Sequence, residues 1–196
     1  MGRDKALLRL GRLTFLEHLV GVLHGEVAPL VVVLGHHGDE IEREISSHQP
    51  LHILRNPDYR LGQLSSLQVA LRFLEGKKAE AALVCLVDHP AITQQVVRRL
   101  LERFYETAAP ILIPTHQGRR GHPVLFSRSM FPELFGAPLQ EGARFVVRRH
   151  EKEVEFVEMD DEGILLDIDR PEDYESLQKR WEELSAADGK PPQEPS

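Results

Sequence analysis

Short apolar runs alternate along the chain with segments whose apolar residues recur at helical spacing. The runs predict strands over 30–35, 51–56, 81–88, 111–114, 123–126 and 154–159. The periodic segments predict helices over 14–23, 39–45, 65–74, 93–104, 142–150 and 173–184. Strands that alternate with helices indicate an α/β sandwich with a largely parallel sheet, built as one domain over residues 1–185.

Several helix starts have recognisable caps. Thr14-Phe-Leu-Glu17 has the spacing of a capping box, and Thr93 is placed to cap the helix that follows it. Asp169, before Arg170-Pro171-Glu172, reads as an N-cap with proline in the first turn and Glu172 completing a box. From Ala186 onward, the Pro- and Gly-containing polar sequence predicts a disordered tail over 186–196.

Asp88 closes one of the most apolar runs of the chain and is followed by His89-Pro90. An uninterrupted aliphatic run predicts a strand buried on both faces, and Pro90 ends it, which puts Asp88 at the carboxyl tip. Ligands of open α/β sheets bind beyond such tips. Asp88 is therefore either a turn or cap residue or an oxygen ligand for Mg²⁺, and we favour the ligand because Thr93 is the better cap.

Composition narrows the class of protein. The chain has 196 residues, 41% hydrophobic and 28% charged, with a net charge of −7 and no block of Lys and Arg, which disfavours a nucleic-acid partner. Its single cysteine, Cys85, excludes an internal disulfide and a paired-cysteine metal site. Without a stretch long enough to span a membrane or a signal-peptide core, we expect a cytoplasmic protein with no membrane partner.

Three further segments carry candidate chemistry. Gly118-Arg-Arg-Gly-His-Pro123 is either a basic turn that meets phosphate through Arg119, Arg120 and His122 or an ordinary hairpin turn. Ser65 and Ser66 at a helix start offer an anion or polar-base site, although a plain N-cap is the better interpretation from the residues alone. Asp167 and Asp169 permit a two-carboxylate metal site beside the capping role.

Other chemistries lack their motifs. The ten histidines show no paired spacing with glutamate that would hold zinc. A serine hydrolase is disfavoured because the chain has no Gly-x-Ser-x-Gly elbow.

Taken in order, seven short segments resemble the landmarks of the molybdenum cofactor nucleotidyltransferases (MobA-like NTP transferases), and the resemblance is closest to the cytidylyltransferase branch. It extends from Met1 to about Leu177. The segments are Met1-Gly-Arg-Asp-Lys5-Ala-Leu-Leu, Asn56-Pro-Asp-Tyr, Gly62-Gln-Leu-Ser-Ser-Leu, Leu86-Val-Asp88-His-Pro, Gly118-Arg-Arg-Gly-His-Pro-Val-Leu-Phe, Glu141-Gly-Ala-Arg144 and Asp167-Ile-Asp-Arg-Pro-Glu-Asp.

The resemblance implies a three-layer Rossmann-like nucleotidyltransferase fold of the GT-A type with a mostly parallel sheet. It implies that the terminal phosphate of molybdopterin attacks the α-phosphate of a Mg²⁺-bound nucleoside triphosphate, CTP more than GTP, with release of pyrophosphate. The matching positions assign catalysis to Lys5 and Asp88, and the metal to Asp88 with Asp169 or Asp167. They also assign nucleotide binding to Lys5, Ser65 and Ser66, and the pterin side to Gly121, His122 and Pro123.

Some positions depart from the family pattern. In the family, a strand and a glycine-rich loop precede the segment that begins here at Met1, so we expect that the recorded start is an internal methionine and that the first strand is missing. His89 stands where glutamine is usual, Gln140 where aspartate is, and Arg170 where threonine is. If the chain is real as written, we expect poor catalysis. The alternatives are a guanylyltransferase of the same cofactor or a non-catalytic accessory, and a xanthine-dehydrogenase-type enzyme is an expected partner.

Overall fold

Strand β6 (Ile111–His116) is the central strand of the main sheet. The computed structural model describes residues 4–45 and 50–187, and the main sheet runs in the order β5, β8, β6, β7, with β9 also on β6. Its other members are β5 (Ala81–Val84), β7 (Arg119–Arg120), β8 (Val124–Ser127) and β9 (Val154–Glu158).

The directions of these strands differ from the expected parallel sheet. Only β9 runs parallel to its neighbour β6, while β5 with β8, β6 with β8 and β6 with β7 are antiparallel pairs. The prediction of a largely parallel sheet was therefore wrong for this main sheet, which is mixed. A parallel crossover needs about a dozen residues or more. The segment that joins β6 to β8 is shorter than this and forms the β7 hairpin, so β6 and β8 run antiparallel.

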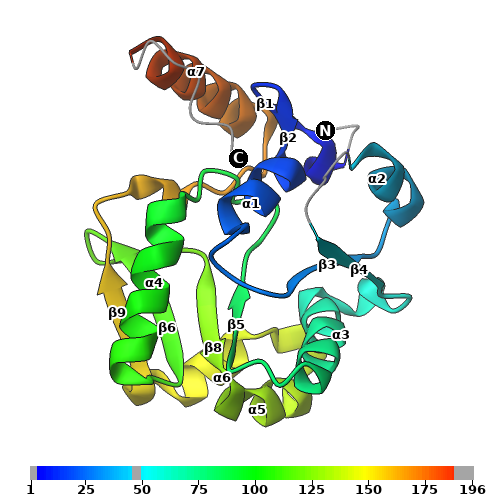
Figure 1. Cartoon of the computed structure of the whole chain (residues 1–196), viewed down its shortest axis with the longest axis vertical. Helices are drawn as coiled ribbons and strands as arrows, with labels where there is room; N and C mark the ends of the chain where they lie inside the picture. Colours follow the sequence, from blue (N-terminus) through cyan, green and yellow to red (C-terminus); the bar gives the residue numbers. More distant parts are fainter. Residues whose placement is uncertain (1–3, 46–49, 188–196) are drawn as a thin grey trace.

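Helices cover both faces of the main sheet, as a three-layer arrangement requires. Ile111, Ile113 and Phe126 pack on one face against α3 (Gln63–Gly76), α5 (Phe131–Gly136) and α6 (Arg144–Arg149). Leu112 and Leu125 pack on the other against α1 (Phe15–Leu23) and α4 (Gln94–Thr107). In Figure 1, α4 accordingly lies along β6. The strand buried on both faces is thus β6.

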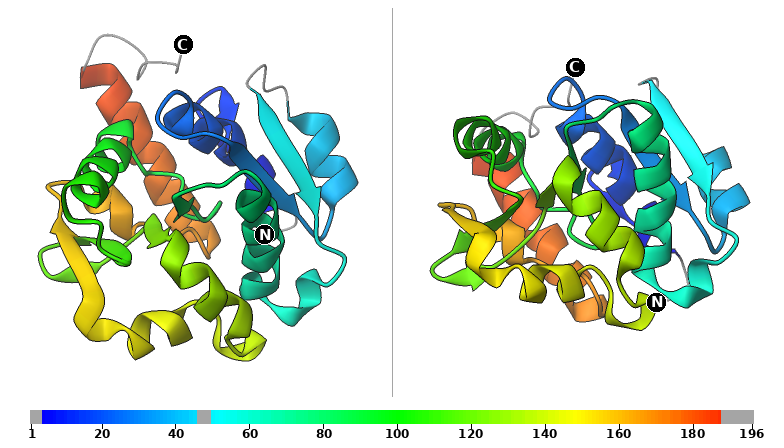
Figure 2. Two further views of the ribbon diagram at one scale, coloured as in Figure 1. Left: turned by 60° about the horizontal axis from the view of Figure 1, so that its bottom comes forward. Right: turned by 90° about the horizontal axis from the view of Figure 1, so that it is seen from below.

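A second sheet holds β3 (Leu30–Leu34) and β4 (Leu51–Arg55), which run parallel and are joined through α2 (Gly38–Glu44). It lies on the other side of the molecule from β9, as Figures 1 and 2 show. Among the described residues β3 pairs only with β4, and β5 pairs only with β8. The two sheets therefore do not join through these strands.

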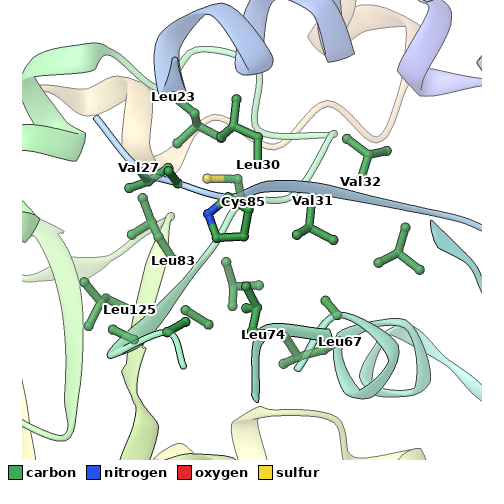
Figure 3. A pocket seen from close by; sticks show the side chains of 18 of the residues that line it. Leu23, Val27, Leu30, Val31, Val32, Leu67, Leu74, Leu83, Cys85 and Leu125 are labelled. Atoms are coloured by element: carbon green, nitrogen blue, oxygen red, sulfur yellow. The ribbon is translucent and has the colours of Figure 1, made fainter. Parts of the chain in front are cut away.

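An apolar cavity of about 700 Å³ lies between β3 and β5. Leu30, Val31 and Val32 of β3 border it on one side, and Leu83 and Cys85 border it on the other (Figure 3). Side chains that face this cavity are only partly covered, so the run from Ala81 to Asp88 is mostly half-buried and not buried on both faces as predicted.

The N-terminal and C-terminal segments pack together. A hairpin of β1 (Arg9–Leu10) and β2 (Leu13–Thr14) leads into α1, and α7 (Pro171–Ala187) lies beside it (Figure 1). Phe15, Ile168 and Leu177 form their shared core. Short 3-10 helices complete the fold at Lys5–Leu7, Tyr59–Leu61, Arg128–Met130, Leu139–Glu141, Glu151–Glu153 and Glu162–Leu165.

The predicted caps are confirmed at two helices and corrected at a third. Thr14 and Glu17 form the complete capping box of α1, and Thr93 caps α4. Helix α7 has Pro171 in its first turn as predicted, but it begins there, two residues before the predicted range 173–184, and the Arg170 amide donates to the carboxylate of Asp173 at 2.9 Å, not to Glu172. The helix includes positions 186 and 187, which were predicted to be tail, and 188–196 lie outside the described residues. Within the described ranges, no helix combines the length and apolarity that crossing a bilayer requires.

Candidate functional site

Asp88 lies in a tight turn four residues beyond the end of β5, not at the tip of the strand itself. The His89 amide donates to the Leu86 carbonyl at 3.1 Å and closes this turn. The sequence-based boundary was too long because the apolar run continues past the last residue that pairs with β8. The carboxylate nevertheless projects beyond the same end of the strand.

An extended segment from the far end of the chain is fastened to this turn. The Ile168 amide donates to the Asp88 carbonyl at 2.9 Å, and the Ile168 side chain is buried. Neighbours of a buried residue in an extended segment point the opposite way, so Asp167 and Asp169 both face outward beside Asp88. One backbone hydrogen bond therefore gathers three carboxylates.

Lys5 reaches the same place from a short N-terminal helix, whose start is capped by the Asp4 side chain and whose Ala6 and Leu7 are buried. Its Nζ lies 2.5 Å from Asp169 Oδ1 and 3.5 Å from Asp88 Oδ2. Burial alone lowers the pKa of Lys5, but the hydrogen bond and charge of Asp169, with the charge of Asp88, outweigh it and raise that pKa. The same hydrogen bond lowers the pKa of Asp169, so this ion pair is charged at neutral pH.

Asp88, His89 and Asp167 each place a ligand atom within 4.8 Å of the others. Burial, followed by the charges of Asp88 and Asp169, raises the pKa of Asp167, as expected for carboxylates crowded together. Carboxylate oxygens are the ligands that Mg²⁺ prefers, so the donor set fits a divalent cation. Of the two carboxylates proposed as partner to Asp88, Asp167 lies in this cluster, whereas Asp169 pairs with Lys5.

Two histidines form the wall of the site. The rings of His89 and His122 lie 4.5 Å apart between centroids, and the Nδ1 atom of each is buried without a hydrogen-bond partner. Burial, followed by the neighbouring His89, lowers the pKa of His122 to about 4, so this ring is neutral at physiological pH. Gly121 and Pro123 flank His122 and bring it from the end of the β7 hairpin into the site.

The two arginines of this segment lie in an ordinary hairpin. Gln117 and Gly118 make its turn with positive φ angles, and β7 pairs with the end of β6. Arg120 forms an ion pair with Glu151 at 3.0 Å and lies over the ring of Phe156. The hairpin interpretation therefore holds for Arg120, whose charge is directed to Glu151.

Ser65 and Ser66 form a second polar group at the start of α3. Neither is an N-cap, because α3 begins at Gln63 and its N-cap is Gly62. The Asn56 side-chain amide donates to both hydroxyls, at 2.8 Å to Ser65 and 2.9 Å to Ser66. Ser66 and Asp88 both line the cavity between β3 and β5, so this cavity connects the two groups.

Two residues gain importance only in the structure. His89 is a potential metal ligand, and its signals in the sequence were its position next to Asp88 and its place where the family usually has glutamine. Asn56 holds the serine pair, and its signals were its place at the end of a strand before Pro57 and the segment Asn56-Pro-Asp-Tyr that resembles a family landmark. The roles of both residues depend on contacts with other segments of the chain, and the sequence pattern alone does not predict these contacts.

Comparison with known proteins finds similar sequences and folds. The sequence profile of the family described as "MobA-like NTP transferase domain" matches residues 1–154. The molybdenum cofactor cytidylyltransferase of Escherichia coli (strain K12) is 25% identical over 184 residues, which are 94% of this chain and 92% of the relative.

A second relative represents another branch. The probable molybdenum cofactor guanylyltransferase of Mycobacterium bovis (strain BCG / Pasteur 1173P2) is 34% identical over 116 residues, 58% of this chain and 55% of its own length. Among solved structures, a Mycobacterium tuberculosis H37Rv protein crystallised in complex with manganese shares the fold. Its TM-score is 0.74 at 24% identity, with 91% of this chain and 93% of that one covered.

Proposed function

The chain belongs to the MobA-like NTP transferase domain family, and from that membership we propose that it transfers CMP from CTP to molybdopterin or its molybdenum-loaded form. An oxygen of the cofactor's terminal phosphate forms a bond to the α-phosphorus of CTP. The bond from that phosphorus to the oxygen bridging to the β-phosphate breaks, and pyrophosphate leaves with the electron pair.

The observation that carries this proposal is that Lys5 pairs with Asp88 and Asp169 where the turn of Asp88 meets the segment of Asp167 and Asp169, with Asp167 beside Asp88. For nucleotidyl transfer, the protein must place positive charge next to the phosphates, and it has little covalent chemistry of its own to perform. Lys5 is a cation already desolvated in part and held by Asp169 and Asp88. It can exchange these partners for phosphate oxygens when the triphosphate binds.

Asp88 and Asp167 would hold a divalent cation, with Asp169 as the carboxylate that positions Lys5. When bound there, the cation supplies neutralisation of charge on the phosphate oxygens. The backbone hydrogen bond from Ile168 to Asp88 keeps the two ligand carboxylates side by side.

Two further groups are assigned to the two substrates. Ser65 and Ser66, oriented by Asn56, are proposed to meet the base and sugar of the nucleotide. Gly121, His122 and Pro123 are proposed to line the pterin side, because the neutral ring of His122 packs against His89, which lies with Asp88 and Asp167.

Transfer of GMP is the second candidate. It is supported by the guanylyltransferase relative, whereas the cytidylyltransferase relative aligns with a larger share of the chain. The test is pyrophosphate release from purified protein with molybdopterin and either CTP or GTP, with the dinucleotide product identified by mass spectrometry. We expect release with CTP. Release with GTP alone would favour the second candidate, and cofactor binding without pyrophosphate release from either would indicate an accessory.

Lys5→Ala tests the role of the cation. We expect kcat/KM for pyrophosphate release to fall on the order of 100-fold or more, as when one preorganised charge-stabilising donor is removed. Lys152→Ala is the matched control because Lys152 lies exposed in a separate short helix, and it should keep wild-type activity. Wild-type kinetics in Lys5→Ala would contradict the assignment.

A further inference from the structure

Of the three candidate metal ligands Asp88, His89 and Asp167, His89 is the one that is not acidic. It is 8% exposed, and its Nδ1 is buried without a hydrogen-bond partner. One of its ring nitrogens lies within 4.8 Å of carboxylate oxygens of both Asp88 and Asp167. A buried polar atom without a partner is uncommon in a native protein and requires an explanation, of which a bound ion is one.

The ring is held in this place by its surroundings. His122 packs at 4.5 Å between ring centroids, and the turn closed by the His89 amide and the Leu86 carbonyl fixes the backbone. The neighbouring segment is fixed as well, since the Ile168 amide donates to Asp88. The imidazole is therefore presented to the carboxylates by packed structure and not by a mobile surface side chain.

We propose that His89 is a third ligand of the metal site, and that the site consequently selects a divalent transition-metal ion such as Mn²⁺ over Mg²⁺. The proposal rests on the function proposed above, because it names the ion that this same site takes. Mg²⁺ is bound by oxygen and keeps several waters, whereas imidazole favours transition metals. One nitrogen and two carboxylates leave positions open for water or phosphate oxygens.

The spacing is compatible with a single ion. Two ligand atoms each bound at about 2.1 Å lie at most about 4.2 Å apart, across the ion. The three donors already lie within 4.8 Å of one another, so only a modest contraction of exposed Asp167 and half-buried Asp88 is needed. Asp88 can turn to the metal while Lys5 keeps its shorter contact with Asp169.

The first test measures metal binding to the full chain without nucleotide. Mn²⁺ is titrated and its free aqueous ion is followed by electron paramagnetic resonance, and Mg²⁺ is then added as competitor. We expect Mn²⁺ to bind at least about tenfold more tightly than Mg²⁺. His89→Gln should weaken Mn²⁺ binding by about 10- to 100-fold and change Mg²⁺ binding little. His52→Gln, exposed on β4, is the matched control and should behave as wild type.

A second measurement on the wild-type protein does not depend on how the variant folds. Electron spin-echo modulation of bound Mn²⁺ should show coupling to an imidazole nitrogen. Bound Mn²⁺ without this coupling, or equal Mn²⁺ and Mg²⁺ affinities in the wild type, would overturn the proposal. Failure here with normal pyrophosphate release in Mg²⁺ would leave the proposed function standing, and nitrogen coupling without pyrophosphate release would contradict that function alone.

Discussion

At the scale of single residues, Gly121 is a position where the backbone leading to His122 passes close to another backbone. A Cβ atom at Gly121 would lie 2.5 Å from the Ile164 carbonyl oxygen. That oxygen accepts the His122 amide at 2.9 Å, and the Gly121 amide donates to Pro114 at 2.8 Å. The absence of a side chain here lets the hairpin and the 3-10 helix Glu162–Leu165 meet, which places His122 against His89.

We therefore expect Gly121→Ala to destabilise the protein by about 1–3 kcal/mol, because the added methyl group must push backbone and not a flexible side chain. Gly76→Ala is the control, since a Cβ at the end of α3 meets nothing within 4 Å. It should be neutral or slightly stabilising. Urea unfolding of the two variants gives the comparison, and equal midpoints would show that the contact at Gly121 relaxes without cost.

Asp167 and Asp169 show why the sequence predicted which residues belong to the site but not what each of them does. Asp167 and Asp169 are two residues apart and chemically identical, and the motif offers both for the metal. Only the positions of Lys5, 164 residues from Asp169, and of His89 separate them. The division into a lysine partner and a metal-cluster member is a property of packing.

At the scale of elements, α1 shows how local sequence and tertiary contact act on one helix. Its capping box was readable because Thr14 and Glu17 are three residues apart and satisfy each other's backbone. His18, in contrast, lies next to them on the helix yet owes its state to α7. Its ring meets the Trp181 ring edge-on at 5.2 Å, and burial lowers the pKa of His18 to about 4.

This pKa predicts a pH dependence of stability. The unfolded chain, with the ordinary histidine pKa of 6.5, binds a proton more readily than the folded protein does. Stability from neutral His18 is therefore present above pH 6.5, is lost as the pH falls toward about 4, and does not change further below that value. The loss is at most about 3 kcal/mol.

Chemical unfolding at several pH values between 4 and 7 measures this effect. His18→Leu should show a shallower loss of unfolding free energy across that range than wild type, whatever its stability at pH 7. His52→Gln is the control: it leaves the buried ring of His18 in place and should retain the wild-type slope. An unchanged slope in His18→Leu would assign the acid sensitivity to other groups.

At the scale of the whole molecule, the two strands that border the apolar cavity, β3 and β5, have fewer partner strands than β6. β6 has partners on both sides and side chains buried on both faces. Among the described residues, β3 and β5 each have one partner strand. Leu, Val and Cys side chains line the cavity between them, and among the described residues no strand pairs with β3 or β5 across it (Figure 3).

Hydrogen exchange should therefore differ across the molecule. We expect backbone amides of Leu112 and Ile113 in β6 to be protected on the order of 100-fold or more beyond those amides of β3 and β5 that face the cavity. Amides of β3 that bond to β4 are the internal control and should fall between the two sets. Exchange at one uniform rate, measured by NMR, would show that the two sheets open as a single unit.

The sequence by itself determined most of the helices and strands, although not α5, β7 or the β1–β2 hairpin, together with the caps of α1 and α4, the family, and the residue types at the site. These follow from interactions within a few residues, namely side-chain periodicity, capping hydrogen bonds and short motifs, which local sequence specifies. Tertiary structure alone decided that the main sheet is mixed, that β5 ends before Asp88, and that a cavity separates β3 from β5. It also placed His89 beside Asp167 and Lys5 beside Asp169, because contacts between segments far apart in sequence arise only when the packed layers bring them together.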